Sequence, residues 1–240
     1  MKDINPELDS SATPQNDNRV FVSRGGIKLQ AAIVNFQLSI VNLTVLDVGS
    51  STGGFVDCLL QNGAKKVYAL DTAYGELAWK LRNDPRVVVM ERTNILRLEK
   101  LSSSVIPAPA RIDTRSVSGR NAGIQLENSS SELDPRLCGD DKEKVDLVTI
   151  DAGWTKLELV LPVVKKFLKP EGKIIALLKP HYEAEKKDLV KGVLPENIAE
   201  QVKDQIVDRL QGTGYRVEKI MESPILGGAG NKEYLLFMKL

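Results

Sequence analysis

The sequence predicts an α/β fold in which helices cover a seven-stranded, mostly parallel sheet with an antiparallel C-terminal hairpin. From residue 43 onward, short β-branched and aliphatic runs alternate with segments of helical periodicity, which is typical of parallel strands joined by crossover helices. The last two strand-like runs are joined by a glycine-rich loop over 227–230 without an intervening helix, so we expect them to pair antiparallel at the sheet edge. An apolar content of 42% is ordinary for a single globular domain, which we predict over 19–240.

The expected elements follow in chain order. Strands are predicted where short runs of β-branched and aliphatic residues occur, at 44–48, 66–70, 87–90, 145–150, 173–178, 215–221 and 234–239. Helices are predicted where apolar residues recur at helical spacing, at 25–36, 54–62, 76–82, 156–168 and 196–211. Pro195 suits the first turn of the last of these helices.

Two segments do not follow this alternation. Residues 1–18 are polar and lack an apolar core, so we expect a flexible arm. Residues 102–142 are rich in Ser, Pro, Asp and Arg without a sustained period, and regular alternation resumes at Val145, as expected for an insertion in a surface loop. This insertion is either disordered and without function, or a loop that binds RNA through Arg111, Arg115 and Arg120.

Composition excludes several classes of protein. The formal net charge of +1 removes any global electrostatic argument for a polyanionic partner, so nucleic-acid binding must be argued locally. Cys58 and Cys138 have no neighbours at metal-ligand spacing, so we predict no metal site and no disulfide framework. No apolar run approaches the roughly 18 residues of a membrane span. We therefore expect a soluble, cytoplasmic protein without a membrane partner, and we predict no obligate protein partner.

A glycine-rich turn over 46–55 (Leu-Asp-Val-Gly-Ser-Ser-Thr-Gly-Gly-Phe) follows the first strand and opens a helix. Strand, glycine-rich turn and helix in this order make a nucleotide-type pocket, in which glycines permit the tight turn and the close approach of a ligand. A turn of this kind also occurs for purely structural reasons. The candidate ligand contacts here are Asp47, Gly49, Ser50, Gly53, Gly54 and Phe55.

Polar residues also follow the next two strands. Asp71 ends the second strand, where a carboxylate can accept both ribose hydroxyls of an adenosine ligand. Alternatively, it caps the following turn through Thr72. Asn94 follows the third strand and either bonds the adenine edge or forms an Asx-turn.

Together these motifs resemble the haemolysin A (TlyA) family, a branch of the FtsJ-like RNA 2′-O-ribose methyltransferases. The resemblance covers most of 19–240 outside the insertion and is carried by the glycine-rich turn and by 22–29 (Val-Ser-Arg-Gly-Gly-Ile-Lys-Leu), 57–60 (Asp-Cys-Leu-Leu), 84–87 (Asp-Pro-Arg-Val), 91–94 (Glu-Arg-Thr-Asn), 178–180 (Leu-Lys-Pro) and 230–234 (Gly-Asn-Lys-Glu-Tyr). It implies a Rossmann-like class I methyltransferase that uses S-adenosyl-L-methionine and methylates a ribose 2′-hydroxyl of ribosomal or another structured RNA. The methionine carboxylate would then lie on the amides that start the helix.

The resemblance also implies a catalytic Lys-Asp-Lys-Glu tetrad at Lys28, Asp151, Lys179 and Glu233. A ribose 2′-hydroxyl is a weak acid, so its attack on a sulfonium methyl group requires a base that is neutral at the working pH. Lys179 is the candidate base, and burial beside the second cation Lys28 would favour its neutral form, while Asp151 and Glu233 orient the amines.

Each tetrad position also has a simpler explanation. Lys28 can be a solvated helix residue, Asp151 a helix cap, and Glu233 an edge-strand charge that deters aggregation. Lys179 closes an apolar run and precedes a proline, so it should lie at the carboxyl edge of the sheet. The only histidine, His181, is expected to be a loop contact, because no acidic partner can be assigned to it from sequence.

Two departures from the family pattern affect the RNA expectation. The family usually carries an N-terminal S4-like RNA-binding domain, whereas only residues 1–18 and a few more precede the first motif here. The family's Val-Ser-Phe-Ile-Ser after the aspartate is replaced by 152–155 (Ala-Gly-Trp-Thr), in which Trp154 either stacks on a base or belongs to the core.

Three other functions remain alternatives to RNA methylation. One is methyl transfer to a non-RNA acceptor, and another is a binding-only remnant that has lost catalysis. The third is a membrane-acting haemolysin, against which the lack of a spanning or strongly amphipathic basic segment argues.

Overall fold

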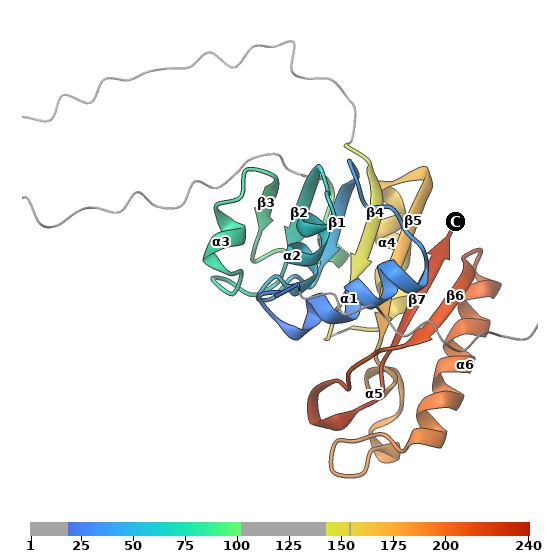
Figure 1. Ribbon diagram of the computed structural model, residues 1–240. Coiled ribbons are helices and arrows are strands. Elements are labelled where there is room, and N and C mark those ends of the chain that lie inside the picture. The colour runs from blue at the N-terminus through green and yellow to red at the C-terminus, as the bar shows by residue number, and fades with distance from the viewer. Residues whose placement is uncertain (1–18, 102–142, 154) are drawn as a thin grey trace, which may run out of the picture.

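A mixed sheet of seven strands in the order β3-β2-β1-β4-β5-β7-β6 forms the centre of the molecule (Figure 1). The first five strands are parallel, while β7 is antiparallel to both of its neighbours. The predicted C-terminal hairpin and the fold class are therefore confirmed, with β6 at the edge. The strands are β1 (Thr44–Val48), β2 (Lys66–Leu70), β3 (Val87–Met90), β4 (Val145–Ile150), β5 (Leu168–Leu178), β6 (Arg216–Glu222) and β7 (Tyr234–Lys239).

The computed structural model describes residues 19–101, 143–153 and 155–240. The expected N-terminal arm, the expected insertion and the alternatives for Trp154 lie outside the described residues. Within these ranges, no helix combines the length and the apolar character needed to cross a membrane.

Six α-helices and four short 3-10 turns connect the strands in the described part of the chain. The helices are α1 (Arg24–Asn35), α2 (Gly54–Gln61), α3 (Trp79–Arg82), α4 (Leu157–Val164), α5 (Pro180–Glu183) and α6 (Glu196–Gly212). The 3-10 turns are η1 (Ile95–Arg97), η4 (Lys165–Phe167), η5 (Lys186–Asp188) and η6 (Gly228–Gly230).

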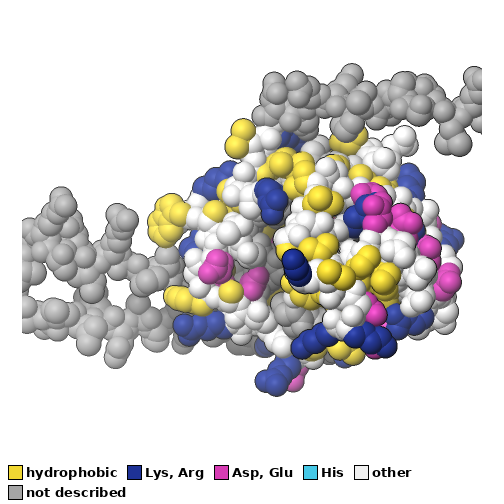
Figure 2. All heavy atoms as spheres, turned by 90° about the horizontal axis from the view of Figure 1, so that it is seen from below, with side chains coloured by type: hydrophobic (Ala, Val, Ile, Leu, Met, Phe, Trp, Pro, Cys, Tyr) yellow, Lys and Arg dark blue, Asp and Glu magenta, His cyan; other side chains and the backbone are white. Residues whose placement is uncertain are grey.

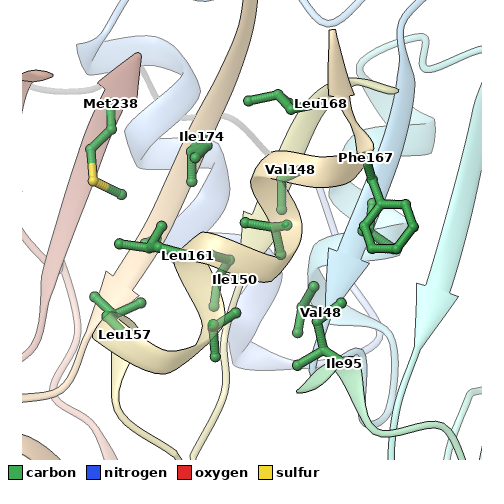
Figure 3. Close-up of a cluster of buried hydrophobic side chains, with 14 of the residues drawn as sticks. Val48, Ile95, Val148, Ile150, Leu157, Leu161, Phe167, Leu168, Ile174 and Met238 are labelled. Carbon is green, nitrogen blue, oxygen red and sulfur yellow. The ribbon is translucent and has the colours of Figure 1, made fainter. Parts of the chain in front are cut away.

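Two hydrophobic clusters cover the two faces of the sheet, because neighbouring residues of a strand point to opposite sides. Val45 of β1 packs with α1, α2 and the segment around α3, whereas Leu46 and Val48 pack with α4 and α6. Figure 3 shows Leu157 and Leu161 of α4 lying over β4, β5 and β7. The parallel strands are buried on both faces, which explains their nearly continuous apolar sequence.

Two predicted helices are shorter than their sequence patterns. The helix expected over 76–82 begins only at Trp79, because the preceding backbone bonds elsewhere: Gly75 N–H donates to Glu91, and Ala78 N–H donates to the Thr52 carbonyl. The helix expected over 156–168 is α4 followed by the 3-10 turn η4.

The fifth strand begins earlier than predicted, at Leu168 instead of Lys173. Leu168 pairs with Val145 and Lys173 pairs with Leu147, so residues 169–172 bulge from the ladder. This bulge contains Pro170 and Gly172, which interrupt the strand pattern and hide its true start.

The strand order reverses its direction of growth at β1. The chain adds β2 and β3 on one side of this strand, and then β4 and β5 on the other side. In open α/β sheets, ligands bind outside the carboxyl ends of the strands at such a switch point. The loops after β1 and β4 are thus the place where the fold offers a site.

Candidate active site

The glycine-rich turn after β1 folds into a tight loop against its neighbours. Gly49 has a φ of +86°, and a Cβ atom there would lie only 2.5 Å from the Asp151 carbonyl oxygen. Its N–H group and that of Ser50 donate to the Leu70 carbonyl at 2.9 and 3.1 Å. Gly53 has a φ of +95°, a conformation that side-chain-bearing residues rarely adopt. The loop therefore needs glycine at both positions.

A cavity of about 230 Å³ lies between this loop and the start of α1. Helices α1 and α2 approach each other closely here, because a Cβ atom on Gly54 would lie 2.2 Å from Ser23 Oγ and 2.9 Å from Gly26 N. The N-termini of α1 and α2, which carry a partial positive charge, thus both lie at this cavity. The lining residues are Ser23, Arg24, Gly25, Lys28, Gly49, Ser50, Ser51, Thr52, Gly54, Phe55 and Asp151.

Asp47, predicted as a ligand contact, lies in β1 with its side chain fully buried. Thr149 Oγ1 donates to its Oδ1 at 2.6 Å, while Oδ2 has no hydrogen-bond partner among the described residues. Burial raises the pKa of the Asp47 carboxyl to about 7. Asp47 does not line the cavity; its contact with the loop runs through its own carbonyl oxygen, to which Ser50 Oγ donates at 3.2 Å.

Asp71 and Asn94 both bond backbone groups. The two carboxylate oxygens of Asp71 accept the N–H groups of Ser51 at 2.7 Å and Ala73 at 2.8 Å. Asp71 thereby ties the glycine-rich loop to the loop after β2 and stays half-exposed beside it. Asn94 accepts the Leu96 N–H at 2.9 Å and caps η1, which is the bond expected of an Asx-turn. Their direct contact with a ligand stays a prediction.

The four tetrad residues form two ion pairs at the same end of the sheet. Lys28 Nζ donates to Glu233 Oε2 at 2.5 Å, and only 10% and 3% of these side chains are exposed. Lys179 Nζ lies 2.5 Å from Asp151 Oδ1. Because Lys28 and Asp151 both line the cavity, the structure brings the two pairs together from α1, from the residue before β7 and from the ends of β4 and β5.

His181 lies within the electrostatic reach of three members of this tetrad. Burial lowers the pKa of its imidazole, and Lys179 and Lys28 lower it further, whereas Glu233 opposes the shift. His181 is half-buried in α5, two residues after Lys179. The acidic group that acts on His181, Glu233, directly precedes β7 and is distant in sequence, which is why it could not be assigned from the sequence.

Sequence reasoning did not assign Ser23, Arg24 and Gly25 to the site, although all three line the cavity. The available signal was their place in the Ser-Arg-Gly-Gly segment just before Lys28. Asp57 holds this segment in place, because its buried carboxylate accepts the Val22 N–H at 2.9 Å and pairs with Lys80 at 2.9 Å.

Comparison with known proteins agrees with this geometry. The family model described as FtsJ-like methyltransferase matches residues 21–240. The protein named "Putative rRNA methyltransferase YqxC" from Bacillus subtilis (strain 168) is 36% identical over 97% of this chain and 70% of its own length. "16S/23S rRNA (cytidine-2'-O)-methyltransferase TlyA" from Mycobacterium tuberculosis (strain ATCC 25618 / H37Rv) is 33% identical over 93% of this chain and 70% of its own length.

A solved structure is similar as well. The "Putative hemolysin from Streptococcus thermophilus" superposes with a TM-score of 0.72 at 32% identity and covers 93% of this chain and 68% of its own. The family match spans the glycine-rich loop, both ion pairs and the C-terminal hairpin. This chain therefore belongs to the FtsJ-like methyltransferase family, and it is a methyltransferase.

Proposed function

We propose that this protein transfers a methyl group from S-adenosyl-L-methionine to a ribose 2′-hydroxyl of ribosomal RNA. The observation that carries the proposal is the position of two Lys–carboxylate pairs beside the cavity of the glycine-rich loop. The names of the relatives, which include rRNA (cytidine-2'-O)-methyltransferases, support RNA as the acceptor.

The cavity fits the methionine end of this donor. Its two converging helix N-termini, Arg24 and Lys28 suit a carboxylate. Asp71 would meet the ribose hydroxyls, since it already bonds the loop that lines the cavity. When bound, the donor supplies an electrophilic methyl group on a sulfonium sulfur.

Lys179 would take the proton of the attacking hydroxyl. The ammonium of Lys179 that pairs with Asp151 would first have to lose its proton. In its neutral form, Nζ would accept the proton of the ribose oxygen as the carbon–oxygen bond forms and the carbon–sulfur bond of the sulfonium breaks. Asp151, 2.5 Å away, would stabilise the ammonium that results. Glu233 fixes Lys28 through the second pair and so holds its charge beside the cavity.

Exposed basic residues would supply the phosphate contacts, because the net charge is near zero. Arg24 beside the cavity and Lys156 before α4 are exposed at the carboxyl ends of the strands. Lys165 and Lys166 are also exposed, but they lie in η4 just before β5 begins, at the opposite end of the sheet. Figure 2 views the side toward which β4 points and shows dark-blue Lys and Arg side chains around a hollow surface.

The test is an acceptor assay with tritiated S-adenosyl-L-methionine and, in parallel, ribosomal subunits, total RNA and a protein extract. We expect label in rRNA at a 2′-O-methylated nucleotide. Label in the protein or small-molecule fraction alone would refute RNA as the acceptor.

Lys179→Ala should lower the transfer rate by about 10²–10⁴-fold, the usual contribution of a general base. The affinity for S-adenosyl-L-methionine, measured by calorimetry, should stay unchanged because Lys179 does not line the cavity. Retained turnover would remove Lys179 as the base.

A further inference from the structure

Tyr182 is an exposed aromatic residue directly beside the proposed base. It is 48% exposed and lies in α5, three residues after Lys179. The Lys179 Nζ atom lies 5.9 Å from the centroid of its ring. A ring this exposed contributes little to the core, so most of its face is accessible to a ligand.

The turn that carries Tyr182 is anchored at both ends. The Tyr182 N–H donates to the Lys179 carbonyl at 2.9 Å, and the neighbouring His181 ring lies 4.3 Å away. Glu183 accepts the Leu157 N–H at 2.9 Å, which fastens α5 to the start of α4. The backbone of the turn is therefore held in place, and the ring packs beside His181.

Gly153 adds no side chain of its own to the gap between the ring and the lysine. A Cβ atom on Gly153 would lie 3.5 Å from Lys179 Nζ and 3.7 Å from both Cε2 and the hydroxyl of Tyr182. Tyr182 does not line the cavity of the glycine-rich loop, whereas Asp151, the partner of Lys179, does. The ring thus lies beside Lys179 but outside the cavity assigned to the donor.

We propose that Tyr182 is the stacking platform for the base of the acceptor nucleotide, whose ribose enters the gap over Gly153 to reach Lys179. This inference rests on the proposed function. An aromatic ring can stack on any base, because every base has a π-face. Tyr182 therefore positions the nucleotide without reading its sequence.

Tyr182→Ala should lower kcat/KM for rRNA by about 5- to 150-fold, the loss expected for one stacked base. Tyr182→Phe, which keeps the ring, should stay within about 2-fold of the wild type. The matched control is Trp79→Ala in α3, another exposed aromatic residue, which should not change kcat/KM. The Kd for S-adenosyl-L-methionine should be unchanged in all three variants.

Gly153→Val provides an independent test, because its side chain would fill the gap between Lys179 and Tyr182. We expect at least a 10-fold loss of transfer to rRNA with an unchanged Kd for the donor. Wild-type kcat/KM in Tyr182→Ala or Gly153→Val would overturn the proposal. So would an equal loss in Tyr182→Phe and Tyr182→Ala, or a matching loss of donor affinity.

A photocrosslink separates this proposal from the function on which it rests. RNA that carries 5-iodocytidine at the target position should crosslink to Tyr182, as located by mass spectrometry, whether or not methyl transfer follows. A wild-type protein that does not methylate RNA refutes the proposed function. Failure to crosslink at Tyr182 refutes the stacking platform.

Discussion

At the scale of single residues, the site depends on glycines that leave room for charged groups. Gly227 packs against Glu233, and a Cβ atom there would lie 2.1 Å from Oε1 and 2.5 Å from Cδ of that carboxylate. Glu233 is in turn paired with Lys28, so a shift of this carboxylate would disturb the pair. The lack of a side chain at Gly227 thus helps to set the geometry of the Lys28–Glu233 pair.

Gly227→Ala should therefore displace Glu233 from Lys28 and lower methyl transfer by at least about 10-fold. Stability should change by only about 1 kcal/mol, because the backbone at Gly227 has a negative φ that alanine accepts. Gly228→Ala is the control, since a Cβ atom there meets nothing within 4 Å. Equal activity of the two variants would contradict this view of the pair.

At the scale of elements, the contact between α1 and α2 determines the shape of the donor cavity. Gly54 lets the start of α2 touch the backbone of α1 at Gly25 and Gly26. The segment before α1 is fastened to α2 through Asp57 and Val22. Lys28 is carried by α1, so this contact also sets the distance between Lys28 and the glycine-rich loop.

Gly54→Ala should push the two helices apart and cost about 1–3 kcal/mol of stability, as over-packing usually does. It should also weaken the binding of S-adenosyl-L-methionine, measured by calorimetry, because the cavity lies between these helices. Gly212→Ala, at the end of α6 with nothing within 4 Å, should leave affinity unchanged. A Gly54→Ala protein with wild-type affinity would show that the cavity tolerates separated helices.

Element identities were largely predictable, while pairings across the molecule were not. Five parallel strands appear as short apolar runs because they are buried on both faces. The start of β5 was hidden by the bulge at Pro170 and Gly172. The tetrad residues could be named from their motifs. Which lysine pairs with which carboxylate depends on the packing of β7 beside β5, and no local pattern encodes that packing.

At the scale of the whole molecule, Asp47 links global stability to pH. Burial raises the pKa of its carboxyl from 3.8 to about 7. Below about pH 4 the carboxyl is protonated in both the folded and the unfolded state, so it has no effect. Between pH 4 and 7 only the unfolded state ionises, and stability falls as the pH rises. Above pH 7 the full cost, about 4 kcal/mol, is present.

Asp47→Asn removes this ionisation. The stability of this variant relative to the wild type should therefore be about 3 kcal/mol higher at pH 8 than at pH 5. The comparison between two pH values cancels any constant effect of the amide. Urea unfolding of the variant and the wild type at both pH values measures this difference in stability.

Asp146→Asn is the control with the opposite sign. The Asp146 carboxylate pairs with Lys169 at 2.6 Å and accepts the Thr44 N–H at 2.8 Å, and these bonds lower its pKa. The Asp146 carboxylate stabilises the fold above the pKa that it has in the unfolded chain, and this stabilisation is lost as the pH falls. Asp146→Asn should therefore be less stable than the wild type at pH 8. A pH-independent difference for Asp47→Asn would show that Asp47 ionises normally in the fold.

The insertion of β7 between β5 and β6 has a consequence for biosynthesis. A nascent chain that has emerged only as far as β6 already contains the glycine-rich loop, Lys28, Asp151 and Lys179, but not Glu233. Glu233, which pairs with Lys28, is synthesised immediately before β7, the strand that pairs with both β5 and β6. We therefore expect chains that end at β6 to lack methyl transfer, because they lack the carboxylate that pairs with Lys28.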